Sequence, residues 1–565
     1  MTNDTQNNEE IIVQSNRQDQ AGHALTSTRL TPKSDTCTVA ITCAPLVVIP
    51  IIFIPGIMGT NLENLDGTVV WNPPNLDGVG PVANAIGQLI KYTFTNAAER
   101  QAALNPLTTR VYYGGSVDAE GAISNELARK RGWGSVSRSA YQPMMSRLQK
   151  ELNKVMEMGE IKAPWDGDAL RKPSDYGEQK GQEALTEHEF KHAANYRFDV
   201  WGGGYNWIKS NSESSSELID YVEKTVLASY AKINQKADKV ILVTHSMGGL
   251  VARAICNIHN YSKVLGAVHG VMPATGAAAT YHHARCGYEG MAATILGRNA
   301  AEVVAVMGNS PGALELIPSA EYNGRKPWLK LGGKTNANPQ LPLADPYDEI
   351  YKSKDWYGLI PARNEYLLDP AKINIKVTNT DSESLEKKRT LRIILDAIID
   401  KVKDFHENIS QKYPKPAYVT YGDDTGQKTW STVHWKGDEL FDYTGFGFAS
   451  DDEKGEISVR TKEGSVIPLK FGKALESGDG TVPAVSGAAP SDYGVIAMFR
   501  QGDQGTGAFL HTKTRTNMKL PSLMATEETL KLSGYEHQNS YNDARAQWAT
   551  LYSIIKIAKD ASWHV

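Results

Sequence analysis

The chain has 565 residues, 41% of them hydrophobic, which is enough apolar material for a large buried core. Its 60 basic and 64 acidic residues leave a net charge of −4, so the composition lacks the basic excess of a nucleic-acid-binding protein. The four cysteines are too few for a disulfide framework and lack zinc-ligand spacing. We interpret them as buried thiols, with a Cys37–Cys43 pair as the alternative, the other two being Cys256 and Cys286.

The N-terminal segment, residues 1–36, is polar and without hydrophobic periodicity, and we expect a flexible tail. Its first ten residues have neither the basic region nor the apolar region of a Sec-type signal peptide. The most apolar run, residues 40–58, is interrupted by three prolines. It therefore predicts strands and not a membrane-spanning helix.

The first buried strand is predicted at residues 47–54. The loop after it, Pro55-Gly56-Ile57-Met58-Gly59-Thr60-Asn61-Leu62, can point backbone N–H groups into a site. In hydrolases built around a nucleophile elbow, one donor of the oxyanion hole comes from the loop after an early strand. We therefore predict the N–H of Ile57 as that donor, with Met58 as the neighbouring candidate and a simple strand-to-loop turn as the alternative.

Residues 66–192 are polar and weakly patterned, and we interpret them as an excursion off the core with a helix near Tyr141–Met156. The chain is expected to return to the core as a strand and a glycine-rich turn at Phe198–Trp207. Ser214 and Glu217 then have the spacing of a capping box, which predicts that a helix begins there.

The strongest local signal lies at residues 240–250, where a short apolar strand runs into Thr-His-Ser-Met-Gly-Gly and then a helix. This order is that of a nucleophile elbow, whose turn holds a serine hydroxyl above the sheet near the positive end of the helix. Ser246 is the predicted nucleophile, and the N–H of Met247 is the predicted second oxyanion donor. Gly248 supplies the small residue that the turn needs, whereas Thr244 replaces the more usual glycine on the near side. The alternative is a strand–helix turn that happens to contain serine.

A further buried strand is predicted at Val264–Val268, followed by a second excursion over residues 277–370. His282 and His283 lack the carboxylate or cysteine partners of a metal site, so we assign them to the surface or to the surroundings of the site. An apolar stripe at helical spacing is interpreted as a lid or pocket wall, with ordinary core as the alternative. It comprises Met291, Ile295, Leu296, Val303, Val304 and Met307.

The C-terminal third begins with a long amphipathic helix predicted over residues 385–411 and strands predicted at 417–421 and 429–435. Gly478-Asp479-Gly480-Thr481-Val482-Pro483 then places a short carboxylate on a tight loop, where it can be aimed at a histidine. An ordinary Asp-Gly turn is the alternative.

His537 lies in a loop just before a closing helix that would hold its backbone firmly. His511 is the rival candidate, and His564 is too close to the chain end to be well held. The chain order Ser246, Asp479, His537 is that of an α/β-hydrolase. His537 would take the proton of the attacking serine, and Asp479 would fix the imidazole tautomer.

These residues predict acyl-ester hydrolysis through an acyl-serine intermediate, which requires no metal and no cofactor. Loop carboxylates such as Asp423 and Asp424 would permit a calcium site, which nothing in the sequence supports. The predicted fold is an α/β-hydrolase, a mostly parallel sheet with helices on both faces, over residues 37–565. The excursions at about 66–192 and 277–370 would be its cap or lid insertions.

Three blocks of the sequence resemble known lipases: residues 54–62, 244–250 and 478–483 are similar to lecithin:cholesterol acyltransferase-like lipases and GPI inositol-deacylase-like hydrolases. With its polar head and large insertions, the chain is most similar to bacterial type VI secretion phospholipase effectors. The resemblance implies a phospholipase that cleaves membrane phospholipids, with a cognate immunity protein and a component of the secretion apparatus as partners. It also implies export from the bacterial cytoplasm without a Sec signal, and action in the periplasm or at the membrane of a target cell.

Two alternatives to a phospholipase remain open from the sequence. One is a carboxylesterase acting on soluble esters, which would use the same triad. The other is a catalytically silent hydrolase fold used for binding, against which the intact Ser246, Asp479 and His537 set argues.

Overall fold

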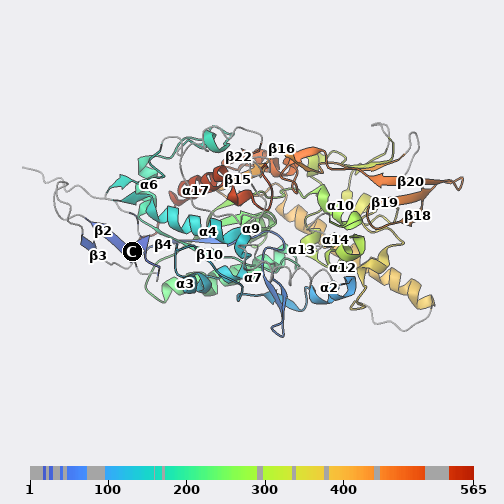
Figure 1. Cartoon of the computed structure of the whole chain (residues 1–565), viewed down its shortest axis with the longest axis horizontal. Coiled ribbons are helices and arrows are strands. Elements are labelled where there is room, and N and C mark those ends of the chain that lie inside the picture. Colours follow the sequence, from blue (N-terminus) through green and yellow to red (C-terminus); the bar gives the residue numbers. More distant parts are fainter. Residues whose placement is uncertain are drawn as a thin grey trace, which may run out of the picture.

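The computed structural model describes residues 15, 17–20, 24–28, 39–41, 47–72, 96–157, 159–167, 172–288, 297–333, 339–374, 381–437, 446–502 and 534–564. The molecule is elongated, and two six-stranded sheets succeed each other along its long axis (Figure 1).

Six parallel strands form the central sheet, in the order β10-β4-β11-β12-β15-β22. Their bounds in that order are Arg197–Gly202, Val48–Ile54, Val240–His245, Val264–Gly270, Ala417–Gly422 and Ala497–Gln501. Every residue of β4, β10 and β11 is buried, as expected of strands that are covered on both faces. The strands predicted in these places are confirmed.

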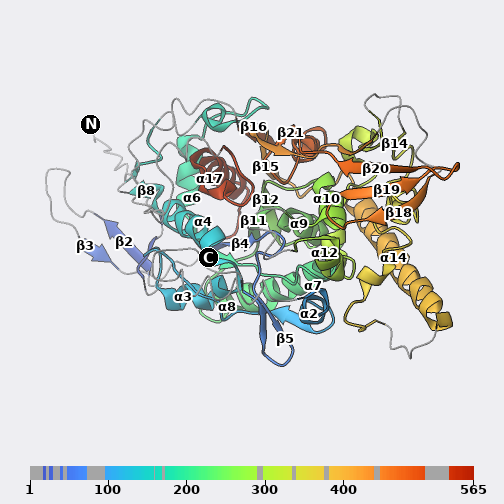
Figure 2. The same cartoon turned by 45° about the vertical axis from the view of Figure 1, so that its right-hand side comes forward.

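Helices cover both faces of the central sheet because the side chains of each strand alternate between two cores. Along β4, Ile51 and Phe53 join one core, whereas Ile52 and Ile54 join the other. The first face carries α4 (Arg138–Glu151), α6 (Glu187–Ala194) and α17 (Ala544–Ala558). The second carries α7 (Asn211–Tyr221), α8 (Ala228–Ala231) and α9 (Gly248–Asn257). This hydrolase body confirms the predicted α/β-hydrolase architecture (Figure 2).

A second sheet has the order β14-β13-β17-β20-β19-β18 and is antiparallel except for the β13–β17 pair. Its strands are Gln340–Leu341, Leu329–Leu331, Val433–Lys436, Val466–Phe471, Glu456–Arg460 and Gly447–Asp451. It shares a third core with α10 (Ala278–Cys286), α12 (Ala300–Met307), α13 (Pro311–Leu314) and α14 (Asp381–Ile409). We call this unit the outer lobe.

The remaining α-helices and strands are short. Helices α2, α3 and α15 span Ala97–Ala103, Asn125–Lys130 and Ala484–Gly487. Strands β5, β6 and β7 (Leu62–Asn64, Val69–Trp71, Thr109–Val111) form one small sheet. Strands β8 and β9 (Met156–Glu157, Glu160–Ile161) pair, as do β16 and β21 (Asp424–Thr429, Glu476–Gly478). The strand predicted at 429–435 is confirmed only at its two ends, since β16 ends at Thr429 and β17 begins at Val433.

The segment expected to be a flexible tail contains short strands in its described part. β1 (Arg17–Gln18), β2 (Ala24–Thr28) and β3 (Val39–Ile41) pair into a small antiparallel sheet. Ser15 is buried against the body, where its Oγ accepts the N–H of Met156 at 2.9 Å. Strand pairing and this contact give the segment more local structure than its composition predicts.

Helix α7 begins earlier than predicted. Its N-cap is Ser210, whose Oγ accepts the N–H of Ser212, and Ser214 lies inside the helix. The predicted capping box of Ser214 and Glu217 is therefore wrong. The cause is a tertiary contact, since Oε2 of the buried Glu315 side chain accepts the Asn211 N–H at 2.8 Å and fixes the helix start.

The apolar stripe interpreted as a lid lies partly outside the described residues, which exclude Met291, Ile295 and Leu296. Its described members lie on α12 and are buried in the core of the outer lobe, as the core alternative expected: Val303, Val304 and Met307. His282 is buried and not at the surface, because its ring stacks on Trp430 at 4.0 Å between centroids. His283 is half-buried and stacks on Tyr288 at 3.8 Å.

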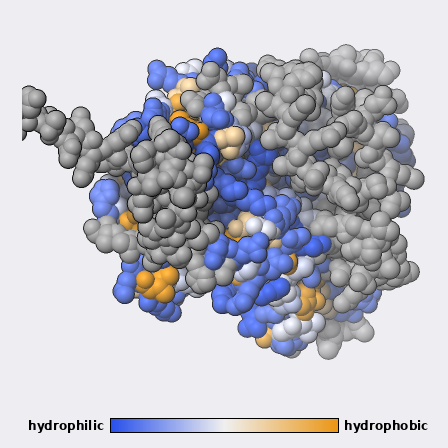
Figure 3. Space-filling view, turned by 60° about the vertical axis from the view of Figure 1, so that its left-hand side comes forward, coloured by the Kyte–Doolittle hydropathy of each residue, from blue (hydrophilic) through white to orange (hydrophobic). Residues whose placement is uncertain are grey.

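Within the described ranges, none of the helices has both the length and the hydropathy needed to cross a membrane. The face seen in Figure 3 is mainly hydrophilic where its residues are coloured, with hydrophobic side chains in small separate groups. Cys286 is buried and Cys256 half-buried, and neither is in a disulfide, whereas Cys37 and Cys43 lie outside the described residues.

Candidate active site

Ser246 sits at the carboxyl end of β11, in the middle of the central sheet, and begins the turn into α9. Its φ of 51° is the left-handed backbone of a nucleophile elbow, and its N–H donates to the Gly270 carbonyl of β12 at 2.8 Å. Gly248 makes this turn possible, because a Cβ there would lie 2.4 Å from the carbonyl oxygen of Ile54. Ligand sites of parallel sheets lie at this edge.

The structure brings the three predicted triad residues together. His537 Nε2 lies 2.9 Å from Ser246 Oγ, and His537 Nδ1 lies 2.8 Å from Asp479 Oδ2. All three side chains are buried, with exposed fractions of 5% for Ser246, 7% for His537 and 1% for Asp479. An acceptor-only carboxylate requires that Nδ1 carries the hydrogen, so Nε2 has the lone pair that accepts the serine O–H.

Asp479 is aimed by the loop that the sequence predicted. Its other oxygen, Oδ1, accepts the N–H groups of Val482 at 2.7 Å and Thr481 at 3.0 Å. This leaves Oδ2 directed at the histidine. Gly422, at the end of β15, lets the loop approach, since a Cβ there would lie 2.7 Å from the Asp479 Cβ.

The loop of residues 534–543, which we call the base loop, holds His537 ahead of α17. The His537 N–H donates to the Asp479 carbonyl at 2.9 Å, and the Tyr535 N–H donates to Asp424 Oδ2 at 2.8 Å. Asp423 accepts hydrogen bonds from Ser477 Oγ and Arg500 Nε. Both carboxylates considered for calcium thus already bind protein donors.

The charge of Asp479 controls the titration of His537. Burial alone would lower the pKa of His537, but the charge and the hydrogen bond of Asp479 hold this pKa above its ordinary 6.5. A raised pKa favours the imidazolium that forms when the ring takes a proton from serine.

The predicted oxyanion donors flank Ser246. Residues 55–61, which we call the oxyanion loop, fold into a tight turn in which the Gly59 N–H donates to the Gly56 carbonyl and Met58 has a φ of 63°. A Cβ on Gly56 would lie 2.9 Å from the Ser246 Cβ, so this loop touches the nucleophile. Among the described residues, the N–H groups of Ile57 and Met247 have no hydrogen-bond acceptor in the protein, as donors reserved for a substrate oxygen require.

Neither rival histidine, His511 or His564, is among the described residues of this site, and a metal site was also considered. His511 lies outside the described residues, and His564 is exposed near the chain end. In the part of the chain that the structure describes, no three His, Cys, Asp or Glu side chains gather as metal ligands would.

Comparison with known proteins identifies the family of this chain. The sequence profile of the family described as "PGAP1-like alpha/beta domain" matches residues 206–282, which include Ser246. A solved structure, "The crystal structure of Tle4-Tli4 complex", contains a chain that is 39% identical, with a TM-score of 0.76, over 91% of this chain and 99% of that one. The chain belongs to the Tle4 family. It is therefore a serine ester hydrolase of the type VI secretion phospholipase effectors.

Two other comparisons add nothing to this family assignment. Phospholipase PlaB from Legionella pneumophila is 10% identical over 50% of this chain and 73% of that chain, with a TM-score of 0.14, so the two structures are not alike. No curated protein matches the chain.

Two side chains next to the triad were not assigned from the sequence. His245 precedes the nucleophile in the elbow motif, and Tyr141 lies on α4, about a hundred residues earlier. Tyr141 and His245 approach to 3.2 Å between Oη and Nδ1. The elbow pattern singles out His245 only as a neighbour of serine, and nothing in the sequence links it to Tyr141.

Proposed function

We propose that this Tle4-family chain hydrolyses the acyl esters of membrane phospholipids with Ser246 as nucleophile, His537 as base and Asp479 as the acid that orients it. The observation that carries the proposal is the continuous line of contacts from Asp479 Oδ2 through the His537 ring to Ser246 Oγ. The line ends at Ser246, whose backbone is strained and which lies at the carboxyl edge of the parallel sheet. Helix α9 begins just after this serine, as in a nucleophile elbow.

The reaction follows from these positions. Ser246 Oγ attacks the ester carbonyl carbon while its proton passes to His537 Nε2, and the carbonyl oxygen becomes an oxyanion bound by the N–H groups of Met247 and Ile57. The tetrahedral species collapses, the C–O bond to the glycerol oxygen breaks, and His537 gives its proton to that oxygen. Water then attacks the acyl-serine with His537 again as base, which releases a fatty acid and restores Ser246.

We further propose that a cognate immunity protein neutralises the enzyme in the producing cell and that the enzyme acts in the periplasm or at the membrane of a target cell. The 39% identical chain is solved in a Tle4-Tli4 complex, which supports a protein partner of this kind. A component of the secretion apparatus would be a second partner.

Product analysis by mass spectrometry tests the substrate. Purified protein is mixed with vesicles of phosphatidylethanolamine and phosphatidylglycerol, beside Ser246→Ala and a control, Ser465→Ala, whose side chain is exposed between β19 and β20. The expected result is free fatty acid with lysophospholipid from wild type and Ser465→Ala and none from Ser246→Ala. Intact vesicle lipid with rapid cleavage of a short p-nitrophenyl ester would favour the soluble-ester carboxylesterase. Activity in Ser246→Ala would overturn the assignment of the nucleophile.

A further inference from the structure

A line of hydrogen bonds runs behind the candidate triad and joins its two loops. The Gly56 N–H of the oxyanion loop donates to Tyr141 Oη at 3.2 Å. Tyr141 Oη lies 3.2 Å from His245 Nδ1, and His245 Nε2 lies 3.0 Å from the main-chain oxygen of His537. The line thus connects the oxyanion loop, α4, β11 and the base loop.

The His537 carbonyl oxygen fixes which atoms donate and which accept along this line of hydrogen bonds. A carbonyl oxygen only accepts, so His245 Nε2 carries the hydrogen that it donates to His537. The Nδ1 of the same neutral ring then has the lone pair, which accepts the Tyr141 O–H, and Tyr141 Oη in turn accepts the Gly56 N–H. The opposite tautomer would set the Nε2 lone pair against the carbonyl oxygen.

The surroundings keep the line dry and rigid. Tyr141 and His245 are each 1% exposed, and the His245 ring lies 5.3 Å, 5.0 Å and 5.9 Å from the rings of Tyr141, His537 and Tyr541. Burial, with the neighbouring His537 charge, lowers the pKa of His245 to about 3, so the ring stays neutral. A Cβ on Gly56 would lie 2.9 Å from His245 Nδ1, which shows how closely the oxyanion loop packs here.

We propose that Tyr141 and His245 are positioning residues, which fix the His537 backbone and the oxyanion loop relative to Ser246 through this line. The inference rests on the proposed function and deepens it. Three hydrogen bonds hold the His537 main chain: its N–H donates to the Asp479 carbonyl, and its carbonyl oxygen accepts from His245 Nε2 at 3.0 Å and from the Ser540 N–H at 3.3 Å. Ser540 belongs to the base loop itself, so the His245 bond is the one that ties this carbonyl to β11. Its loss is expected to shift His537 Nε2 relative to Ser246 Oγ, and small displacements at a reacting centre slow the chemical step strongly.

The outer lobe supplies a matched control with the same arrangement. Tyr347 Oη lies 2.6 Å from His406 Nδ1, and His406 Nε2 lies 2.8 Å from the Glu315 main-chain oxygen. His406 is also buried, with its pKa lowered to about 4 by that burial. Tyr347→Phe removes an equivalent buried hydroxyl without touching either loop of the site.

Steady-state kinetics on phosphatidylglycerol vesicles compares the two tyrosines. Tyr141→Phe is expected to lower kcat about tenfold with KM changed less than about twofold, because the substrate contacts remain. Tyr347→Phe is expected to leave kcat within about twofold of wild type. An unchanged kcat in Tyr141→Phe, or an equal fall in both variants, would overturn the proposal.

A second pair of variants tests His245 by rescue. His245→Gln keeps an N–H donor near the place of Nε2, whereas His245→Leu has none. The expected order of kcat is wild type, then Gln, then Leu, with Gln at least about fivefold above Leu at equal far-ultraviolet circular dichroism. Equal kcat values for Gln and Leu would refute the role of the bond. Loss of vesicle hydrolysis in Ser246→Ala tests the proposed function separately, so either idea can fail alone.

Discussion

Asp479 decides the ionisation of the candidate base at the scale of single residues. Its Oδ1 is occupied by two backbone N–H groups, and its Oδ2 faces His537 Nδ1 at 2.8 Å. The carboxylate raises the pKa of His537 against a burial that would lower it. Activity requires the neutral ring, so kcat/KM falls as pH drops through a pKa that lies above 6.5.

Replacing this carboxylate by an amide predicts a change in both rate and pH profile. Asp479→Asn removes the charge while keeping the shape, so burial dominates and the pKa of His537 falls. The acid limb of the kcat/KM profile should move to lower pH, while kcat falls about 10⁴-fold if experience with other serine hydrolases transfers. The measurement is the pH dependence of ester hydrolysis.

The control for this change is Asp423→Asn, at a carboxylate that binds Arg500 and Ser477 and does not face His537. Its acid limb should coincide with that of wild type. An acid limb that stays in place in Asp479→Asn would contradict the role given to Asp479.

At the scale of elements, strands covered on both faces and the elbow could be predicted because local sequence determines them. Val48–Ile54 is a continuous apolar run, β11 begins with the apolar residues 240–243, and Gly248, two positions after Ser246, is the glycine that the turn needs. The start of α7 could not be predicted, since it depends on Glu315, about a hundred residues away. The contact between Tyr141 and His245 could not be predicted for the same reason, because it forms only when α4 packs on the sheet.

A single methyl group added at Gly248 is expected to lower both stability and activity strongly, because the elbow has no room for it. In Gly248→Ala, the new Cβ would lie 2.4 Å and 2.5 Å from the carbonyl oxygens of Ile54 and Pro55, which are backbone atoms that cannot rotate away. We expect a destabilisation of about 1–3 kcal/mol in urea unfolding and loss of most activity, since the turn that presents Ser246 must shift.

Gly447→Ala is the matched control, at a strand position where the nearest atom to the new Cβ is 3.8 Å away. It should change the unfolding midpoint little and leave activity intact. Wild-type activity in Gly248→Ala would show that the strand-to-helix turn does not set the position of the nucleophile.

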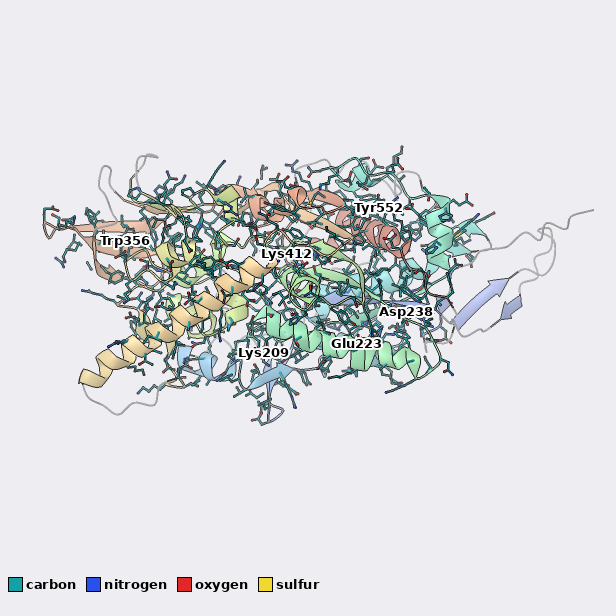
Figure 4. All side chains as sticks on the ribbon, turned by 180° about the vertical axis from the view of Figure 1, so that it is seen from behind. Lys209, Glu223, Asp238, Trp356, Lys412 and Tyr552 are labelled. Atoms are coloured by element: carbon teal, nitrogen blue, oxygen red, sulfur yellow. The ribbon has the colours of Figure 1, made fainter. Side chains whose placement is uncertain are left out.

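At the scale of the whole molecule, helix α14 ties the outer lobe to the hydrolase body. It starts in the outer lobe and ends near Lys412, where its carboxyl end meets α9 (Figure 4). Buried Arg253 of α9 donates to the carbonyl oxygens of Lys412 at 3.0 Å, Ile409 at 2.5 Å and Ala274 at 2.7 Å. One cation therefore satisfies the end of α14 and the loop after β12.

The mostly antiparallel sheet of the outer lobe could not be predicted from the sequence, because its strands come from distant segments.

The variant Arg253→Leu measures how much this junction between the lobe and the body contributes to the free energy of unfolding. Three carbonyl groups, two of them in buried hydrogen bonds, lose their charged donor, so we expect a destabilisation of about 3 kcal/mol in urea unfolding. Lys224→Ala, which removes an exposed ion pair with Asp220, should change stability by about 0.5 kcal/mol or less. Equal effects of the two variants would mean that Arg253 does not hold the lobe to the body.

Covalent labelling of the nucleophile shows which side chain attacks the ester. Wild-type protein, Ser246→Ala and His537→Gln are treated with a fluorophosphonate probe, and the modified peptide is identified by mass spectrometry. We expect a single adduct on Ser246 in wild type, none in Ser246→Ala, and much slower labelling in His537→Gln. An adduct on another residue, or labelling of Ser246→Ala at the wild-type rate, would show that Ser246 is not the nucleophile.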